Sequence, residues 1–141
     1  MVSSNETEIR NLIERWLDGI QKHNLDQILP NHSSDILMFD LPGPVQLQGI
    51  EAYKESWIPL FVCLREDGIF DLSEINVTAG EEVAFATALI HCSGTEPNGE
   101  KSSVLGRLTI GLRKINGQWI VIHEHHSEPS PGQLQELGYN R

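Results

Sequence analysis

The sequence predicts a single α+β domain in which a curved antiparallel sheet wraps around helices. In the first half of the chain, apolar residues recur every three or four positions, which is typical of amphipathic helices. From residue 69 onward the apolar period changes to two, which is typical of strands. Long strands need cover on one face, and the helices supply apolar surface for it. The 141 residues, 39% of them apolar, are enough for one core.

The first helix begins at a capping signal near the N-terminus. Ser3 and Glu6 have the spacing of a capping box, and Asn5 with Glu8 offers an alternative start. A shorter helical piece is predicted over residues 25–29. The apolar stripe of the first helix consists of Ile9, Leu12, Ile13, Trp16, Leu17 and Ile20.

A short strand and a second long helix are predicted next. The apolar segment 36–41 is typical of a strand, which the Pro42-Gly43-Pro44 sequence stops with a tight turn. An amphipathic helix follows Gly49, and Pro59 is expected to kink it or to split it near Ile58. The apolar side of this helix consists of Ile50, Tyr53, Trp57, Leu60, Phe61 and Leu64.

A meander of four strands completes the predicted sheet. The two-residue period predicts strands at 69–79, 82–93, 102–114 and 118–127. Asn116-Gly117 is the strongest hairpin signal in the chain, because a type I′ turn needs positive φ at both central residues. The domain is expected to span residues 1–128. Residues 129–141 are expected to form an irregular tail, which Leu134 and Leu137 could dock.

The chain is strongly acidic, with 20 acidic and 10 basic residues and a formal net charge of −10. This charge repels the phosphates of nucleic acids and of anionic membrane surfaces, so neither is an expected partner. No apolar stretch approaches the ~20 residues that cross a bilayer, and no secretory leader is recognisable before the first helix. A cytoplasmic protein is therefore expected.

The cysteine and glycine patterns predict neither a metal nor a bound cofactor. Cys63 and Cys92 form no Cys-x-x-Cys pair and lie in different predicted elements. They are interpreted as small buried hydrophobes rather than as a disulfide or zinc ligands. The sequence also contains no glycine-rich phosphate loop and no nucleophile elbow.

The last predicted strand contains the most unusual segment, His123-Glu124-His125-His126. Two histidines two positions apart, such as His123 and His125, could bind a metal, contact a ligand carbonyl or carboxylate, or have only structural partners. The spacing identifies no third protein ligand for zinc, so a polar pocket lining is preferred to a metal site. Strict alternation predicts one face with Trp119, Val121, His123 and His125, and the other with Ile120, Ile122, Glu124 and His126.

Two charged residues lie in apolar segments. Arg107 lies between apolar residues, so it either meets a ligand carboxylate or an acidic side chain, or stays solvated on the surface. Asp40 ends the short strand, and a carboxylate in an apolar pocket has a raised pKa that suits a general base or acid. The alternative is an aspartate that caps its turn by bonding the following backbone.

Three aromatic residues on the helices are candidates for ligand contact. Helical spacing turns Trp16, Tyr53 and Trp57 toward the inside of the fold. Aromatic residues in such positions are more often core than ligand platform, so each alone is weak support for a pocket.

Three segments share their order and spacing with a known superfamily. They are Ser34-Asp35-Ile36-Leu37-Met38-Phe39-Asp40, then Gln48-Gly49-Ile50-Glu51-Ala52-Tyr53, and last a hairpin from Arg107-Leu108-Thr109 through Asn116-Gly117-Gln118-Trp119 to His123-Glu124-His125-His126-Ser127. With the opening helix, they resemble the nuclear transport factor 2-like superfamily, in particular its ketosteroid isomerase-like and SnoaL-like branches. The resemblance extends from Glu6 to Pro129.

The resemblance implies a cone: a strongly bent antiparallel sheet, closed by helices, with a pocket at its wide end. It also implies a homodimer formed through the sheet, for which the face with Ile120, Ile122, Glu124 and His126 is the candidate contact.

The resemblance implies chemistry at one position only. Asp40 falls where ketosteroid isomerases place their proton-shuttling carboxylate. Trp16 occupies the position of the oxyanion-hole tyrosine, and the second acid position falls near Gly106 or Arg107. An enolate would therefore lose both of its usual stabilising donors. Because such donors are commonly the largest catalytic contribution, steroid isomerisation itself is not expected.

Three functions compete on this basis. The first is an isomerase, cyclase or hydratase, in which Asp40 moves a proton beside a carbonyl of an apolar substrate while His125 and Arg107 polarise the oxygen. Here His123 and the three aromatic residues contact the ligand. The second is a module that binds a small ligand in the same pocket without chemistry. The third is an association domain whose dimer is the functional product.

Overall fold

The predicted α+β fold is confirmed by the structure, a computed structural model that describes residues 3–41 and 43–139. Pro42, in the predicted turn, lies outside the described residues. In chain order the elements are α1 (Ser4–Gln21), α2 (Leu25–Ile28), β1 (His32–Phe39), β2 (Leu47–Gln48), α3 (Ile50–Cys63), β3 (Ile69–Ala79), β4 (Val83–Thr95), β5 (Lys101–Ile115), β6 (Gln118–Ser127) and α4 (Pro131–Glu136).

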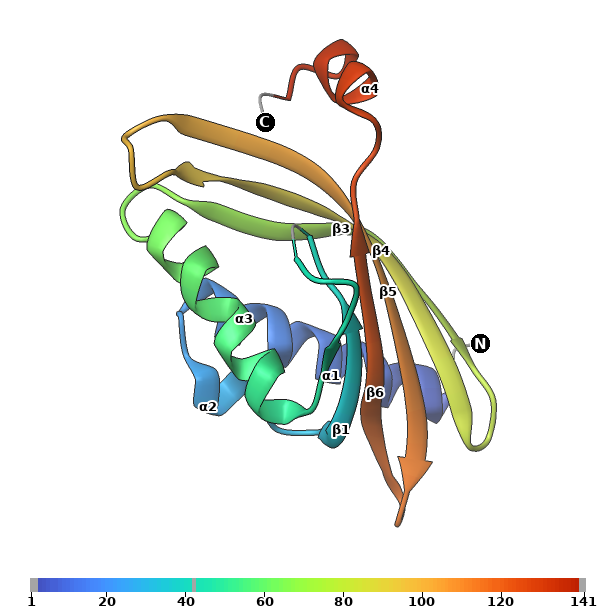
Figure 1. Ribbon diagram of the computed structural model, residues 1–141. Helices are drawn as coiled ribbons and strands as arrows, with labels where there is room; N and C mark the ends of the chain where they lie inside the picture. The colour runs from blue at the N-terminus through green and yellow to red at the C-terminus, as the bar shows by residue number, and fades with distance from the viewer. Residues whose placement is uncertain (1–2, 42, 140–141) are drawn as a thin grey trace.

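The strands form one curled, unclosed sheet in the order β2-β1-β6-β5-β4-β3. β3 to β6 form the predicted antiparallel meander. β1, however, pairs with β6 in parallel, so the sheet is mixed rather than purely antiparallel as predicted. Figure 1 shows α1, α2 and α3 on one side of the sheet, with the upper part of the sheet bending over α3.

The two long helices cover the inner face of the sheet. α1 begins at the predicted cap, where Ser3 Oγ accepts the Glu6 backbone N–H at 3.1 Å. α3 continues through Pro59 to Cys63, so the predicted split near Ile58 does not occur. A Cβ at Gly94 would overlap the carbonyl oxygen of Cys63, so the C-terminal end of α3 lies directly against β4. This close approach sets the position of α3 beneath the bent strands.

A β-bulge in β6 changes which side chains point inward. Val121 lies opposite Leu112 and His123 lies opposite Gly111, so two residues of β6, Ile122 and His123, lie against one residue of β5. Such a bulge shifts the alternation of side chains by one position and bends the strand. A sequence-based alternation carried through the whole strand is therefore wrong after Val121.

The side chains of β6 after the bulge follow the shifted pattern. Glu124 is fully buried and His126 has a side chain only 10% exposed, whereas His125 is exposed. The predicted dimer face is therefore divided, because Glu124 and His126 point into the fold while Ile120 and Ile122 are only partly buried.

Part of the tail that was predicted to be irregular, Pro131–Glu136, forms a short helix, α4. α4 begins after Ser130, whose Oγ accepts the Gln133 backbone N–H at 3.3 Å. Leu134 is 3% exposed and docks the tail, whereas Leu137 is 52% exposed. The hydroxyl of Tyr139 lies 3.3 Å from His91 Nδ1, which places the tail against the outer face of β4. Figure 1 shows α4 beyond the end of β6.

Two further features complete the fold. The turn between β5 and β6 has positive φ at Asn116 (51°) and Gly117 (79°), as predicted for a type I′ hairpin. In the described part of the chain, no helix combines the length and the apolar character needed to span a bilayer.

Candidate functional site

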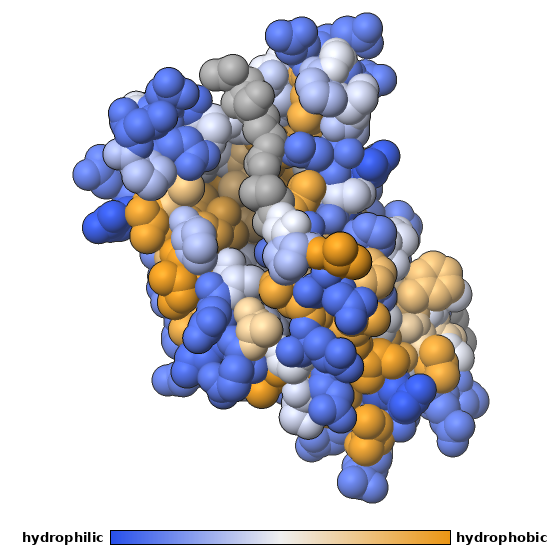
Figure 2. Space-filling view, viewed as in Figure 1, coloured by the Kyte–Doolittle hydropathy of each residue, from blue (hydrophilic) through white to orange (hydrophobic). Residues whose placement is uncertain are grey.

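A cavity of about 680 Å³ lies between α3 and the inner face of the bent sheet. Figure 2 shows a recess in this region whose visible wall is hydrophobic. Four polar residues, Glu96, Glu100, Lys101 and Ser102, line the end nearest the β4–β5 connection, and Asp40 and His126 lie together on another part of the wall. The apolar wall includes Met38, Leu41, Trp57, Leu60, Phe70, Ile90 and Val104.

Asp40 and His126 are the ionisable pair of this wall. Asp40 Oδ1 lies 3.7 Å from His126 Nδ1, and the two side chains are 20% and 10% exposed. Asp40 Oδ1 also accepts the Leu41 backbone N–H at 2.8 Å. Burial raises the pKa of Asp40, and this outweighs the opposite effect of the nearby His126. Asp40 therefore combines the two roles weighed from the sequence, a pocket carboxyl and a local backbone acceptor.

Glu124 lies behind His126 and is completely buried. Its carboxylate accepts hydrogen bonds from the Tyr53 hydroxyl at 2.6 Å, from His126 Nε2 at 3.0 Å and from His32 Nε2 at 3.2 Å. Burial alone would raise the pKa of Glu124, but the hydrogen bonds and charges of His126 and His32 lower it to about 2. Glu124 is therefore an ionised carboxylate inside the core.

Trp16 and Tyr53 extend this hydrogen-bonded chain toward α1. The Trp16 indole N–H donates to the Tyr53 hydroxyl at 2.9 Å. Burial, and next the charge of Glu124, raise the pKa of Tyr53 well above its usual 10, so the phenol stays protonated and donates to Glu124. Both residues lie in the core behind the wall of the cavity, whereas Trp57, also predicted as a ligand contact, forms part of that wall.

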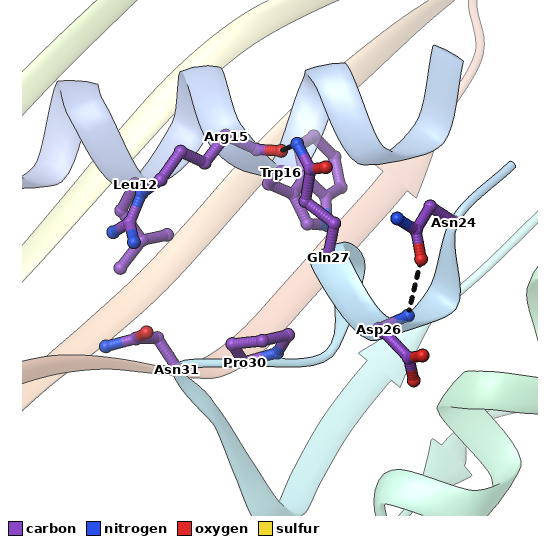
Figure 3. Close-up of a pocket in the computed structure, with 8 residues that line it drawn as sticks. All are labelled: Leu12, Arg15, Trp16, Asn24, Asp26, Gln27, Pro30 and Asn31. Carbon is purple, nitrogen blue, oxygen red and sulfur yellow. Dashed lines mark hydrogen bonds between the residues drawn. The ribbon is translucent and has the colours of Figure 1, made fainter. Parts of the chain in front are cut away.

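Trp16 lines a second, smaller cavity of about 220 Å³ between α1 and residues 24–31. Figure 3 shows that polar groups of this cavity satisfy one another: Gln27 Nε2 donates to the Arg15 carbonyl at 2.9 Å, and Asn24 Oδ1 accepts the Asp26 backbone N–H at 3.1 Å. These contacts hold the connection after α1 in place, and they account for this cavity without a ligand.

The remaining predicted site residues lie on the outer side of the sheet. His123 Nδ1 lies 2.6 Å from the Leu37 carbonyl oxygen, and Phe39 makes edge contacts with the rings of His123 and His125. Arg107 is exposed and donates to Ser127 Oγ at 3.0 Å and to the Glu128 carbonyl oxygen at 2.9 Å. The structure thus brings Asp40 and Trp57 to the cavity, and it separates His123, His125 and Arg107 from it.

Sequence reasoning missed Glu124 and His126, and also His32, as members of the site. One signal was present: Glu124 shares a predicted face with Ile120 and Ile122, and a carboxylate in such company needs partners. The two cysteines, interpreted as buried hydrophobes, form no disulfide; both are partly buried and part of the cavity wall. Over residues 3–41 and 43–139, the His, Cys, Asp and Glu side chains form no group of three able to hold a metal ion.

The chain is similar to several known proteins. A model of the SnoaL-like domain matches residues 9–131. An NTF2-like protein of unknown function from Pseudomonas putida is 33% identical in sequence, with 92% of this chain and 89% of that chain covered and a TM-score of 0.76. The curated proteins contain no match.

Two other solved structures share the fold at low sequence identity. A ketosteroid isomerase-like protein from Erwinia carotovora is 17% identical, with 92% of this chain and 100% of that chain covered and a TM-score of 0.75. The CaMKII hub of S. rosetta is 14% identical, with the same coverage of 92% and 100% and a TM-score of 0.76. At such identities the likeness extends to the fold alone.

The match over residues 9–131 and the likeness to the Pseudomonas protein confirm the superfamily that the sequence motifs indicated. The curled sheet, the helices on its inner face and the order of elements agree with this assignment. The chain belongs to the SnoaL-like family of the nuclear transport factor 2-like superfamily.

Proposed function

We propose that the cavity binds an apolar small molecule with a carbonyl group, and that Asp40 and His126 transfer a proton beside that carbonyl. The observation that carries the proposal is the pairing of Asp40 Oδ1 and His126 Nδ1, 3.7 Å apart, on the wall of a largely apolar cavity of about 680 Å³. Cavities of about 300–1,000 Å³ with apolar walls and a few polar groups are typical ligand sites. His126 here takes the place that the sequence suggested for His125.

The proposed chemistry uses one proton shared between Asp40 and His126. The member of the pair without a proton removes one from the carbon next to the carbonyl. The C–H electron pair becomes a new C=C bond, and the π pair of the carbonyl moves to its oxygen, which gives an enolate. The protonated member donates a hydrogen bond to that oxygen. Return of a proton to a carbon atom restores the pair, so the reaction is an isomerisation or an exchange and needs no cofactor. A raised pKa of Asp40 suits this role, because acid–base groups work best near the ambient pH.

Deuterium exchange into simple ketones tests this proposal, whatever the natural substrate is. The protein is incubated in D₂O with a panel of apolar ketones and enones, and proton NMR follows the loss of the hydrogen next to the carbonyl. We expect Asp40→Asn and His126→Gln each to slow the exchange about a hundredfold or more, the usual contribution of a positioned acid or base. Thr109→Ala, at an exposed site on the outer face, is the matched control.

Three outcomes of this experiment separate the competing assignments. Exchange that survives both Asp40→Asn and His126→Gln would contradict the proposed chemistry. A loss of exchange in His125→Gln but not in His126→Gln would show that His125 is the partner of Asp40, as the strict alternation of side chains in the sequence predicted. Ketones that bind without any exchange would leave the non-catalytic ligand-binding module as the better account.

Self-association is a second candidate function, and exposed apolar residues on the outer face of β4 favour it. Val83 is 63% exposed and Phe85 is 50% exposed, while farther along the same strand the Tyr139 hydroxyl lies 3.3 Å from His91 Nδ1. The hub domain of S. rosetta has the same fold. We therefore propose a homodimer formed through the outer face of the sheet. Light scattering should give twice the chain mass, and Phe85→Glu should give the monomer mass; a monomeric wild type would exclude the dimer.

The cellular setting that we propose is the cytoplasm. Cys63 and Cys92 form no disulfide, as is usual for cysteines in a reducing compartment. The net charge of −10 opposes binding to nucleic acids or to anionic membranes, which we do not propose as partners.

A further inference from the structure

We propose that Glu124 is a positioning residue that holds a proton on His126 Nε2, so that only His126 Nδ1 gains and loses a proton. Nδ1 is the ring nitrogen that lies beside Asp40. The consequence for catalysis rests on the proposed function of the Asp40–His126 pair. The assignment of the proton rests on hydrogen bonding alone and can be tested without a substrate.

The groups around Glu124 come from three elements. His126 faces it from its own strand β6, His32 faces it from β1, and the Tyr53 hydroxyl faces it from α3. Asp40, at the end of β1, acts on His126 from the opposite side. Glu124 is fully buried, and an ionised carboxylate can only accept hydrogen bonds. Each of its three polar partners must therefore supply a proton to the hydrogen bond that it makes with Glu124.

His32 supplies the charge that balances Glu124. His32 Nδ1 lies 2.9 Å from the carbonyl oxygen of Pro30, which can only accept, so Nδ1 has a proton. His32 Nε2 lies 3.2 Å from Glu124 Oε2, another acceptor, while the Tyr53 hydroxyl uses its own proton for Glu124 at 2.6 Å. Both ring nitrogens of His32 therefore hold protons, and His32 and Glu124 form a buried ion pair.

This balance leaves His126 free to change its charge. Because His32 already neutralises Glu124, His126 needs to supply only a hydrogen bond, from Nε2 to Glu124 Oε1 at 3.0 Å. The proton on Nε2 leaves the lone pair of a neutral His126 on Nδ1, 3.7 Å from Asp40 Oδ1. The opposite tautomer would turn an N–H toward Asp40 and remove the base from the cavity. A carboxylate that orients a histidine in this way is a common device for fixing a tautomer.

Nitrogen-15 NMR of histidine-labelled wild-type protein tests the proton assignment directly. The His126 ring signals are identified by their loss in His126→Gln, and the spectra are followed from pH 5 to pH 8.5. We expect Nε2 to stay protonated throughout, and any response to pH to be confined to Nδ1. A neutral His126 with its proton on Nδ1, or an equal mixture of tautomers, would overturn the proposal. This measurement needs no variant of Glu124 and no ligand.

Two variants test the roles of Glu124 and His32. In Glu124→Gln we expect a mixture of both His126 tautomers and ketone exchange slowed about ten- to a hundredfold, the usual cost of losing an orienting partner. In His32→Gln we expect His126 to hold protons on both nitrogens at neutral pH, because it becomes the only histidine able to neutralise Glu124. Unchanged His126 spectra in both variants would overturn the proposal. The His125 signals, from the outer face, are the internal control.

The two proposals fail in different ways. If the NMR spectra show the expected tautomer but His126→Gln leaves exchange unchanged, the proposed function fails and the proton assignment stands. If exchange depends on His126 while its proton lies on Nδ1, the positioning role of Glu124 fails and the acid–base role of His126 stands.

Discussion

His126 separates two carboxylates whose pKa values shift in opposite directions. On the core side, the pKa of Glu124 is lowered to about 2 although the residue is completely buried. On the cavity side, the pKa of Asp40 is raised although its side chain is still 20% exposed. Burial disfavours the charge of both groups, so burial alone cannot explain the difference.

Hydrogen bonds and charges from neighbouring side chains explain the difference. Glu124 has donors on His32, His126 and Tyr53, which together replace the water that it lost. Asp40 has the backbone N–H of Leu41 and only a distant His126. A carboxylate that is fully partnered is structural and stays ionised at neutral pH, whereas one with an incomplete set of donors can exchange a proton more easily. In the proposed chemistry, the wall of the cavity therefore carries the carboxyl that exchanges a proton, and the core behind it carries the ionised one.

Acid unfolding tests the lowered pKa of Glu124, and it is expected to show the larger of the two effects on stability. Because the folded pKa of Glu124 is about 2 and the ordinary value is 4.5, the unfolded chain binds more protons between these pH values. The stability that Glu124 contributes is therefore present above pH 4.5 and lost as the pH falls toward 2. The expected loss in the free energy of unfolding is about 3 kcal/mol. Urea unfolding followed by circular dichroism at each pH measures it.

Substitution of the same residue identifies the source of this loss. Glu124→Gln should be less stable than wild type at pH 7, because it leaves His32 without a counter-charge, and its stability should fall less below pH 4.5. Asp35→Asn, at an exposed carboxylate on β1, should keep the wild-type fall. Parallel curves for wild type and Glu124→Gln below pH 4.5 would show that Glu124 is not the fixed charge described here.

The sequence predicted the fold better than the site, and β6 shows why. Period, turn residues and family motifs place each of the long strands within a few residues, because side-chain alternation and the Asn116-Gly117 turn are local properties. The bulge at Ile122 depends on how the sheet bends around α1 and α3, so a local pattern cannot predict it. A single extra residue placed His126, rather than the predicted His125, on the wall of the cavity.

The remaining differences have the same physical origin. Asp40 and Trp57 were assigned to the pocket because a strand end and a helix face are defined by nearby residues. The parallel pairing of β1 with β6 joins residues some 90 positions apart, among them His32 and Glu124. No pattern in the sequence around His32 or Glu124 indicates that the two residues are in contact. The ion pair between His32 and Glu124 therefore depends on the pairing of β1 with β6 in the sheet.

Asp40→Asn gives the smaller test, and its expected effect on stability is opposite to that of Glu124→Gln. The folded protein disfavours an ionised Asp40, so it holds a proton on Asp40 at pH values where the unfolded chain has already lost it. Stability therefore falls as the pH rises above the ordinary value of 3.8. Asparagine cannot ionise, yet its side-chain oxygen can still accept the Leu41 N–H. We expect Asp40→Asn to be more stable at pH 7 by about 0.5–2 kcal/mol, the range of single stabilising substitutions.

The pH dependence of this gain in stability tests whether it comes from the removal of the ionised Asp40 carboxylate. Thermal unfolding of Asp40→Asn and wild type should give a gap at pH 7 that closes below about pH 3.8, where Asp40 is protonated in both states. A destabilised Asp40→Asn at pH 7 would mean that attraction to His126 outweighs burial, and Asp40 would then belong with Glu124 as a fixed charge. The same substitution is expected to slow ketone exchange. A variant that gains stability while losing exchange would show that the fold tolerates a poorly solvated carboxylate at this position for the sake of its chemistry.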